Sequence, residues 1–338
     1  MDIEPPHLHL TVRNAFTRAG LSYDNAEVLA RELTAATLAG YESHGIGRVR
    51  TYVDALKSGD VKASAQPYVV RESAATALLD GDQGIGILVA IEAARIVAQK
   101  AQFTGIAAVS VRNCGDVARL APYAERIARE GLIGILMAND AGGGIAVAPH
   151  GSPQALFSTN PIAAGIPRPQ GQILVFDFAT SQIAMGAARA AARRHESVPP
   201  EALIDHDGNL VSDPEALFSG LASLLPLGGL AFGFKGTALA LLVEALAGGL
   251  SGDGLSGDAP ERQNRNALFL LAINPEAFLP HNDFETRVEA LLARLRACPP
   301  IPGAPTLRIP GERAQHREGS RIAVPEALWA DLQTLSMP

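Results

Sequence analysis

Cysteine is nearly absent from this chain of 338 residues, which contains only Cys114 and Cys298. Two such cysteines cannot build the disulfide framework of a small secreted domain, and no Cys-x-x-Cys pair is present to hold zinc or an iron–sulfur cluster. The eight histidines are scattered, without the spacing that is typical of metal ligands. We therefore predict no bound metal and expect a reducing, cytoplasmic location.

An excess of basic charge is also missing. The formal net charge is −7, and no basic run with interleaved aromatic residues occurs, so nucleic acid is not an expected partner. The longest apolar runs, such as Gly236 to Leu250 with Glu244 inside it, are shorter than the roughly 20 residues that span a bilayer. Met1 to Leu10 carries acids, prolines and histidines, which is the wrong chemistry for a signal peptide. We expect no association with a membrane.

The motifs of several common enzyme classes are absent. The nearest approaches to a Gly-x-Gly-x-x-Gly fingerprint, at Gly45-Ile46-Gly47 and Gly84-Ile85-Gly86, lack the third glycine, so a Rossmann fold is not predicted. The P-loop, the Gly-x-Ser-x-Gly nucleophile elbow and the His-Glu-x-x-His zinc helix are missing as well.

What the chain does contain is an ordered series of helical and β-type patterns, with 47% hydrophobic residues. Asp24-Asn25-Ala26-Glu27 resembles a capping box and begins a helix that Gly40 ends, and a second helix is predicted from Gly47 to Lys57. From about Val69, β-branched runs alternate with helical patterns, including a helix from Val117 to Glu130. The predicted fold class is α/β.

Three regions follow from these patterns. Residues 1–68 form a helical lobe, and residues 69–298 form the α/β domain, with a helical subdomain around 181–255. Residues 299–338 begin with a proline-rich, extended stretch and end in a helix that we expect to return to the N-terminal lobe.

The most informative stretch is Glu42-Ser43-His44-Gly45-Ile46-Gly47-Arg48. His44 and Arg48 are four residues apart and would share a face if the second helix started one turn early. Arg48 supplies a planar fork for a substrate carboxylate, His44 can transfer a proton near neutral pH, and Ser43 can orient His44. The alternative is that Ser43 and His44 are turn residues and Arg48 a surface charge.

Two glycine-rich turns are candidate binding loops. Ala141-Gly142-Gly143-Gly144 follows a strand, where glycines let backbone amides approach an anion. The second predicted turn extends from Leu225 to Gly236 and contains a single lysine, Lys235. Each turn can equally be a flexible connector.

Taken together, the residues resemble the malate/L-lactate dehydrogenase-like oxidoreductases, which include ureidoglycolate dehydrogenase, diketogulonate reductase and the Δ1-piperideine-2-carboxylate/Δ1-pyrroline-2-carboxylate reductases. The resemblance covers nearly the whole chain and rests on many short matches in order. These are Ser43-His44-Gly45-Ile46-Gly47-Arg48 with Tyr52, Arg112-Asn113-Cys114, Gly131-Leu132-Ile133-Gly134, Thr159-Asn160-Pro161-Ile162-Ala163, Asp177-Phe178-Ala179-Thr180-Ser181, Leu225-Pro226-Leu227-Gly228-Gly229, Lys235-Gly236 with Leu242-Val243-Glu244, and Pro310-Gly311-Glu312-Arg313.

The resemblance implies an unusual, non-Rossmann NAD(P)-binding α/β fold: a mixed sheet with flanking helices plus an N-/C-terminal helical lobe, usually as a homodimer. It implies that His44 is the proton donor, that Ser43 hydrogen-bonds beside it, and that a small carboxylate substrate is bound by Arg48, Tyr52 and Thr159. The residues implied along the cofactor are Asp116, Val117, Ala118, Arg119, Leu120, Asp177, Phe178, Ala179, Lys235, Gly236, Gly311, Glu312 and Arg313. The expected cofactor is NADPH or NADH, with NADPH favoured, and Arg119, Arg308 or Arg313 is eligible to meet a 2′-phosphate.

Three departures from the family pattern are present. Asp116 stands where the family usually has a cofactor-side histidine, and Met185 and Ala187 stand where its reductase and lactate/malate branches have polar partners of the catalytic histidine. The turn before Lys235 also carries extra residues, Leu230 to Gly233, which we expect to reshape the pocket wall.

The sequence therefore predicts a reductase of a small substrate that carries a carboxylate next to a C=N or C=O bond. A cyclic imino acid is favoured over a linear 2-oxo acid, and the lengthened turn raises the option of a larger biosynthetic intermediate. The alternative, motivated by Asp116, Met185 and Ala187, is a member that has lost hydride transfer and binds a ligand or catalyses a non-redox step.

Overall fold

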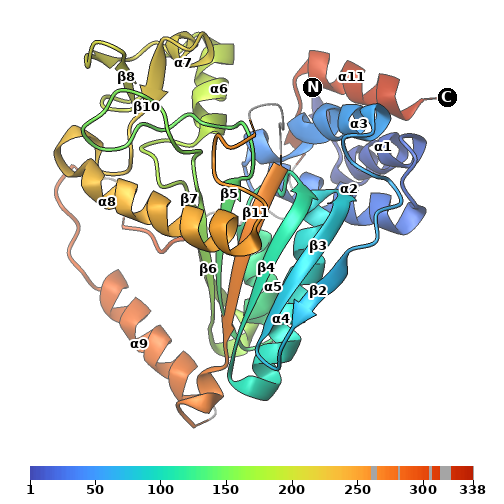
Figure 1. Ribbon diagram of the computed structural model, residues 1–338, viewed down its shortest axis with the longest axis vertical. Helices are drawn as coiled ribbons and strands as arrows, with labels where there is room; N and C mark the ends of the chain where they lie inside the picture. The colour runs from blue at the N-terminus through green and yellow to red at the C-terminus, as the bar shows by residue number, and fades with distance from the viewer. Residues whose placement is uncertain (260–264, 281, 304–306, 313–320, 338) are drawn as a thin grey trace.

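A helical lobe joins the two ends of the chain in this computed structural model, which describes residues 1–259, 265–280, 282–303, 307–312 and 321–337 (Figure 1). β1 pairs with β12, and Trp329 and Leu332 of α11 join Leu8 and Phe16 of α1 in one buried cluster. The elements of this lobe are β1 (Asp2–Ile3), α1 (Pro5–Arg18), α2 (Tyr23–Leu38), α3 (Val49–Ser58), β12 (Ile322–Ala323) and α11 (Glu326–Ser336).

Helix α2 begins slightly earlier than the sequence pattern predicts. Ser22, rather than Asp24, caps it, because the Ser22 hydroxyl accepts the Asn25 amide at 3.3 Å. The helix ends at Leu38, and Gly40 leaves it with a φ of +86°, a conformation that glycine adopts readily.

A seven-stranded mixed sheet forms the centre of the molecule. Its order is β2-β3-β4-β11-β5-β6-β7, with β3 and β4 parallel and the other neighbouring strands antiparallel. Its strands are β2 (Tyr68–Glu72), β3 (Thr76–Gly84), β4 (Ile106–Gly115), β5 (Ile133–Asp140), β6 (Ile162–Pro167), β7 (Ile173–Phe178) and β11 (Arg265–Ile273). The predicted mixed sheet is confirmed, and β11 enters its middle from far along the chain.

Two helices, α4 (Gly86–Thr104) and α5 (Ala121–Arg129), cover one face of this sheet (Figure 1). Buried alanines and valines recur along α4 at helical spacing, so the helix packs closely on the β-branched residues of the strands. The largest apolar core of the protein lies between these helices and the sheet.

The helix predicted over Val117–Glu130 is too long. Helix α5 starts only at Ala121, because the amides of Leu120 and Ala121 are bonded to the Asp177 carboxylate, at 2.8 and 2.9 Å. Residues 116–120 are therefore a loop at the end of β4, and the amides of Val117, Ala118 and Leu120 are bonded to side chains instead of to helix carbonyls.

A smaller unit packs above one end of the sheet. Its elements are α6 (Met185–Arg194), β8 (Leu203–Asp205), β9 (Leu210–Val211), α7 (Glu215–Phe218) and β10 (Ala222–Leu224), with β8 in the centre of its three strands. Ala188 and Ala191 of α6 join Leu203 and Leu224 in its core.

The turn predicted from Leu225 to Gly236 is wrong over most of its length. Helix α8 (Gly229–Val243) starts at its glycines and continues into a π-helical stretch over Glu244–Gly249. Leu230 to Gly233 thus form the first turn of a helix rather than a loop. Glycine is a poor helix former, but here Gly233 and Gly236 let the helix lie close to Pro226 and Leu227, where a Cβ would be 2.8 and 2.4 Å from the nearest atom.

The joined helix is 21 residues long with a mean hydropathy of 1.6, long and apolar enough to cross a membrane by length and composition alone. Val243 and Ala247 instead pack on Met137 and Ile162 of the sheet, and Glu244 is buried. The second half of this joined helix therefore packs on the central sheet. Helix α9 (Asp283–Arg296) is held to the rest of the molecule by the buried Arg168, which donates to Glu289 at 2.8 and 2.9 Å.

Candidate active site

Polar residues gather at one end of the strands of the mixed sheet, which is called here the edge of the sheet. Asp116 follows β4, Asn139 and Asp140 end β5, Asn266 starts β11, and Asp177 lies near the end of β7. These positions share an edge because β11 runs antiparallel to β4 and β5. Ligands of α/β proteins are commonly bound at such strand ends.

Ser43 and His44 reach this edge from the helical lobe. They lie on a short 3-10 turn, and a second 3-10 turn carries Arg48 instead of the early start of α3 expected from the sequence. Residues 43–48 thus form a corner between α2 and α3. The Thr37 hydroxyl fixes this corner by accepting the Ile46 amide at 2.9 Å. Ser43 Oγ lies 2.9 Å from His44 Nδ1, so a hydrogen bond orients the imidazole.

Helix α6 closes the corner from the other side. A Cβ built on Gly186 would lie only 2.4 Å from Ser43 Cβ and Oγ, so a glycine is required for this approach. Met185 and Ala187 lie on this helix, at the positions where the sequence resemblance leads us to expect polar partners of His44. Ser43 is the group that contacts the His44 ring nitrogen here.

The imidazole of His44 is held mainly in its neutral form. Burial lowers the pKa of His44 below its ordinary value of 6.5, and the nearby charges of Arg48 and Arg119 add to this effect. The carboxylates of Asp116 and Asp177 act in the opposite direction and do not outweigh burial.

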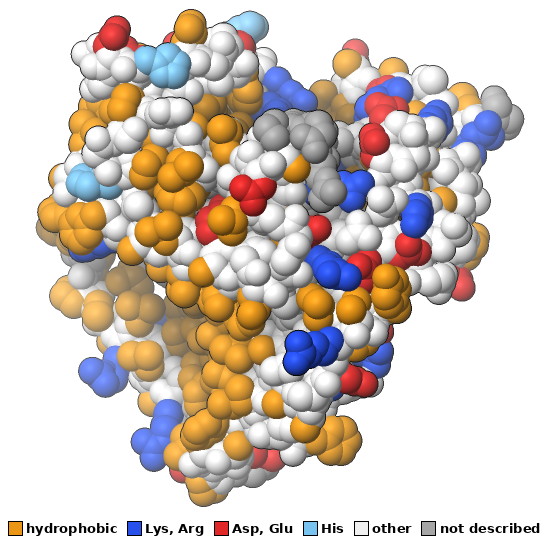
Figure 2. Space-filling view, viewed as in Figure 1, with side chains coloured by type: hydrophobic (Ala, Val, Ile, Leu, Met, Phe, Trp, Pro, Cys, Tyr) orange, Lys and Arg blue, Asp and Glu red, His pale blue; other side chains and the backbone are white. Residues whose placement is uncertain are grey.

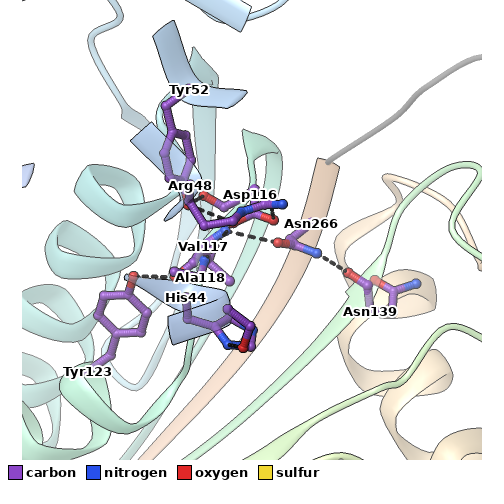
Figure 3. A network of polar contacts seen from close by, with 10 residues as sticks. His44, Arg48, Tyr52, Asp116, Val117, Ala118, Tyr123, Asn139 and Asn266 are labelled. Carbon is purple, nitrogen blue, oxygen red and sulfur yellow. Dashed lines mark hydrogen bonds and ion pairs between the residues drawn. The ribbon is translucent and has the colours of Figure 1, made fainter. Parts of the chain in front are cut away.

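Arg48 and Tyr52 converge on the carboxylate of Asp116, as Figure 3 shows. Arg48 Nη2 donates to Asp116 Oδ2 at 2.6 Å, and the Tyr52 hydroxyl donates to Oδ1 at 2.6 Å. The Ala118 amide adds a third bond to Oδ1 at 2.9 Å. The side chains of Arg48 and Asp116 are only 15% and 25% exposed, so this ion pair is shielded from solvent.

The ion pair fixes the charges of both partners. Burial acts to raise the pKa of Asp116, but the Arg48 guanidinium and the bonds from Tyr52 and Ala118 outweigh it and lower that pKa. Burial acts to lower the pKa of Arg48, and Asp116 and Tyr52 reverse this and raise it. Arg48 is therefore not a surface charge; its charge is met by a carboxylate of the protein itself.

Arg119 lies on the same loop with most of its side chain buried. Its guanidinium stacks on the Tyr41 ring at 4.1 Å and its Nη2 lies 3.9 Å from Glu125. Nε and Nη1 are buried without a hydrogen-bond partner among the residues that the structure describes. Burial raises the pKa of nearby Asp177, against the amides of Ala121 and Leu120 and the charge of Arg119. The buried donors of Arg119 are suited to an anionic group.

A chain of amide side chains crosses the sheet from this loop to Thr159. The Val117 amide donates to Asn266, which donates in turn to the Asn139 carbonyl at 2.9 Å (Figure 3). Asn139 and Asn160 both donate to the buried carboxylate of Glu244, at 3.0 and 2.8 Å. Thr159 is the neighbour of Asn160, so this network fixes the backbone on which it lies.

Several of these residues were missed by sequence reasoning: Tyr41, Asn139, Asp140, Gly186 and Asn266. Asn160 and Glu244 were noticed only as parts of longer motifs. A glutamate inside an apolar helix was the available signal for Glu244, because such a charge needs buried partners. The asparagines gave no signal, since their partners lie on other strands.

The other residues assigned to the cofactor are not all brought together. Gly311, with a φ of +87°, lies against β7, since a Cβ there would be 2.7 Å from the Val175 carbonyl, and Glu312 is bonded to Arg296 at 2.9 Å. Lys235 is exposed near the rings of Phe232 and Phe234, and Gly236 packs against the backbone of Leu227. Arg313 lies outside the described residues.

A neutral, oriented imidazole beside a shielded guanidinium suits proton transfer next to a bound anion. This combination has the chemistry of an enzyme that acts on small anionic molecules.

Comparison with known proteins gives the family. The family model described as malate/L-lactate dehydrogenase matches residues 3–333, so the chain belongs to this family of NAD(P)-dependent oxidoreductases. It is 35% identical to malate dehydrogenase of Pyrococcus abyssi over 89% of this chain and 84% of that one. It is also 35% identical to Δ1-pyrroline-2-carboxylate/Δ1-piperideine-2-carboxylate reductase of Pseudomonas syringae pv. tomato, over 91% of this chain and 87% of that one.

The fold agrees with the family. The crystal structure of malate dehydrogenase from Entamoeba histolytica superposes with a TM-score of 0.93 at 28% identity, covering 99% of this chain and 97% of that one. The resemblance stated from the sequence is thus confirmed. The family includes both 2-hydroxy acid dehydrogenases and imino acid reductases, acts on small carboxylates and uses NAD(H) or NADP(H).

Proposed function

We propose that this protein reduces a small substrate in which a carboxylate lies next to a C=N or C=O bond, with a cyclic imino acid favoured. The observation that carries the proposal is the position of His44, oriented by Ser43 beside the guanidinium of Arg48. Such a pair can hold a carboxylate and protonate the neighbouring heteroatom.

In this proposal each residue of the corner has a separate task. Arg48 binds and orients the substrate carboxylate together with Thr159, and Tyr52 supports them through Asp116, which accepts its hydroxyl. His44 donates a proton to the oxygen or nitrogen that gains electron density. Ser43 selects the ring orientation of His44 through Nδ1, which leaves Nε2 for the substrate. The bound nicotinamide cofactor supplies the hydride.

The residues of the 116–120 loop fit such a cofactor. The two unpartnered donors of Arg119 are suited to a phosphate oxygen, and Asp177 holds the start of α5 beside them. We propose that this loop, Phe178 and Ala179 and the Gly311–Glu312 turn border the cofactor, and that NADPH is favoured over NADH. Lys235 and Gly236 would complete that border from α8.

The test is a titration of the purified protein with NADPH and with NADH, followed by assays of cofactor oxidation. The substrates are Δ1-pyrroline-2-carboxylate, Δ1-piperideine-2-carboxylate, pyruvate and bulkier 2-oxo acids. We expect saturable binding and the highest turnover with a cyclic imino acid. Absence of binding to both cofactors would reject the proposal and favour the non-redox alternative that Asp116, Met185 and Ala187 suggest.

We also propose that the protein is a cytoplasmic homodimer. Leu230, Phe234 and Leu241 recur at helical spacing on α8 and are 44%, 54% and 54% exposed, which is unusual for large apolar side chains so close together. Figure 2 shows apolar side chains continuing below α8 over the sheet, where Ile135 and Phe269 are only partly buried. Below α8, no described helix covers this face of the sheet. A second copy of the chain would cover it.

The dimer proposal predicts that Leu241→Glu separates the two copies. A charge on this face would lose its solvation if the face were buried in a dimer. Sedimentation velocity should give a dimer for the wild type and a monomer for Leu241→Glu, while Phe103→Glu, at a site 91% exposed on α4, should remain dimeric. A monomeric wild type at micromolar concentration would contradict the proposal.

A further inference from the structure

The ion pair between Arg48 and Asp116 limits how a substrate anion can bind to Arg48. In the proposed function Arg48 binds the substrate carboxylate, yet its Nη2 already donates to a carboxylate of the protein at 2.6 Å. Tyr52 and Ala118 hold Asp116 in place through two further bonds. Asp116 is therefore a fixed anion at the position where a substrate anion has to bind.

Before substrate binds, the ion pair of Arg48 and Asp116 has no net charge, and the charges of Arg119 and Asp177 act on His44 in opposite directions. Arg48 is positive, Asp116 is kept negative by its lowered pKa, and His44 is mainly neutral. Arg189 of α6 lies close enough that the charges of Arg48 and Asp116 affect its pKa, but it stacks near Phe218, on the exposed side of the helix. A substrate with only a carboxylate would place two anions on one shielded guanidinium.

A zwitterionic substrate avoids this excess of negative charge. In a protonated cyclic imine the carboxylate lies one atom away from a C=NH⁺ group, so the carboxylate can pair with Arg48 while the cation pairs with Asp116. We propose that Asp116 is the specificity-determining residue that makes this site select protonated imino carboxylates over 2-oxo acids. This assignment rests on the proposed function.

With Asp116 in this role, the proton, the hydride and the electrons of the C=N bond are all accounted for. When the imine enters the site neutral, the protonated form of His44 gives its proton to the nitrogen, and Asp116 stabilises the iminium cation that forms. An imine that enters protonated is already that cation and needs no proton from His44. Hydride from the reduced nicotinamide cofactor then forms a C–H bond at the iminium carbon, and the C=N electron pair moves to nitrogen. The product is a cyclic amino acid, and the cofactor leaves oxidised. A 2-oxo acid offers Asp116 no such cation.

The test uses two ligands of the same ring size, neither of which can accept hydride from the reduced cofactor that is bound in these measurements. L-Proline carries a ring ammonium, and tetrahydrofuran-2-carboxylate carries a ring oxygen in its place. Both are measured as competitive inhibitors of imine reduction, and their binding is measured calorimetrically with the cofactor bound. For charges about 5 Å apart near a protein surface, we expect the wild type to bind L-proline roughly tenfold to hundredfold more tightly.

Neutral variants of Asp116 should remove that preference. Asp116→Asn keeps the side-chain volume and an oxygen for Tyr52 and Ala118, and we expect the two ligands to bind within about threefold of each other. Asp116→Ser is a second neutral variant should the first fail to fold, and Asp116→Glu should keep the preference for L-proline. Asp54→Asn, on an exposed carboxylate of α3, is the charge-matched control and should behave like the wild type.

The outcomes separate the two proposals. If neither ligand binds and no substrate is reduced, the proposed function fails. If the enzyme reduces a substrate but the wild type does not prefer L-proline, or if neutral variants keep that preference, the assignment of Asp116 is overturned while the reductase function stands.

Discussion

Replacing His44 with Asn is expected to lower turnover by roughly 10² to 10⁴, the usual contribution of a positioned acid or base. Asn cannot donate a proton at neutral pH, but its size lets it occupy the same corner beside Ser43 and Gly186. Since His44 reaches the site from the helical lobe and not from the 116–120 loop, cofactor affinity should change little. Steady-state assays and a cofactor titration of the same variant separate the two effects.

The pH dependence gives an independent check on His44. Burial lowers its pKa below 6.5, so the protonated form that donates a proton becomes scarce as the pH rises through that lowered pKa. The rate of reduction should therefore fall with rising pH from below 6.5, while the reverse oxidation, which needs neutral His44, should rise over the same range and then level off. The part of both dependences that comes from His44 should vanish in His44→Asn, while the part that comes from protonation of the substrate nitrogen should remain. Unchanged turnover in that variant would reject the assigned role.

The sequence was sufficient for those features that are local in the chain. The Ser43–Arg48 stretch, the end of α2 near Gly40 and the alternation of strands and helices are all written in neighbouring residues. The family resemblance added the mixed fold, because its short motifs occur in order over most of the chain. Each of these depends on spacing within one segment.

The features that the sequence could not give depend on contacts between distant segments. Asp116 meets Arg48 across 68 positions, and Asn266 reaches Asn139 across 127. The glycines before Lys235 predict a turn, since their local preference opposes a helix. In the structure Gly233 lies against Pro226 and Gly236 against the Leu227 backbone, contacts with distant residues that the local pattern does not contain. The same limit applies to α5, whose start is set by the distant carboxylate of Asp177.

Removing the guanidinium of Arg48 is the second change with a large expected effect. Arg48→Gln should raise the substrate KM by roughly 10- to 100-fold and change kcat less, because a carboxylate clamp binds ground and transition states alike. Arg48→Lys should lie between, since it keeps the charge but loses the planar fork. Arg50→Gln, whose exposed side chain pairs with Asp331, is the matched control and should keep the wild-type KM.

The same variant should reveal the structural part of the ion pair. Arg48→Gln leaves Asp116 without its cation in a mostly shielded position, which should cost about 1–3 kcal/mol of the free energy of unfolding after allowance for its partial exposure. Adding Asp116→Asn to Arg48→Gln should recover most of that loss, because no unpaired charge then remains. Denaturant unfolding of the two single variants and the double variant measures this coupling. An unchanged KM in Arg48→Gln would reject the clamp, and additive losses would show that the pair does not stabilise the fold.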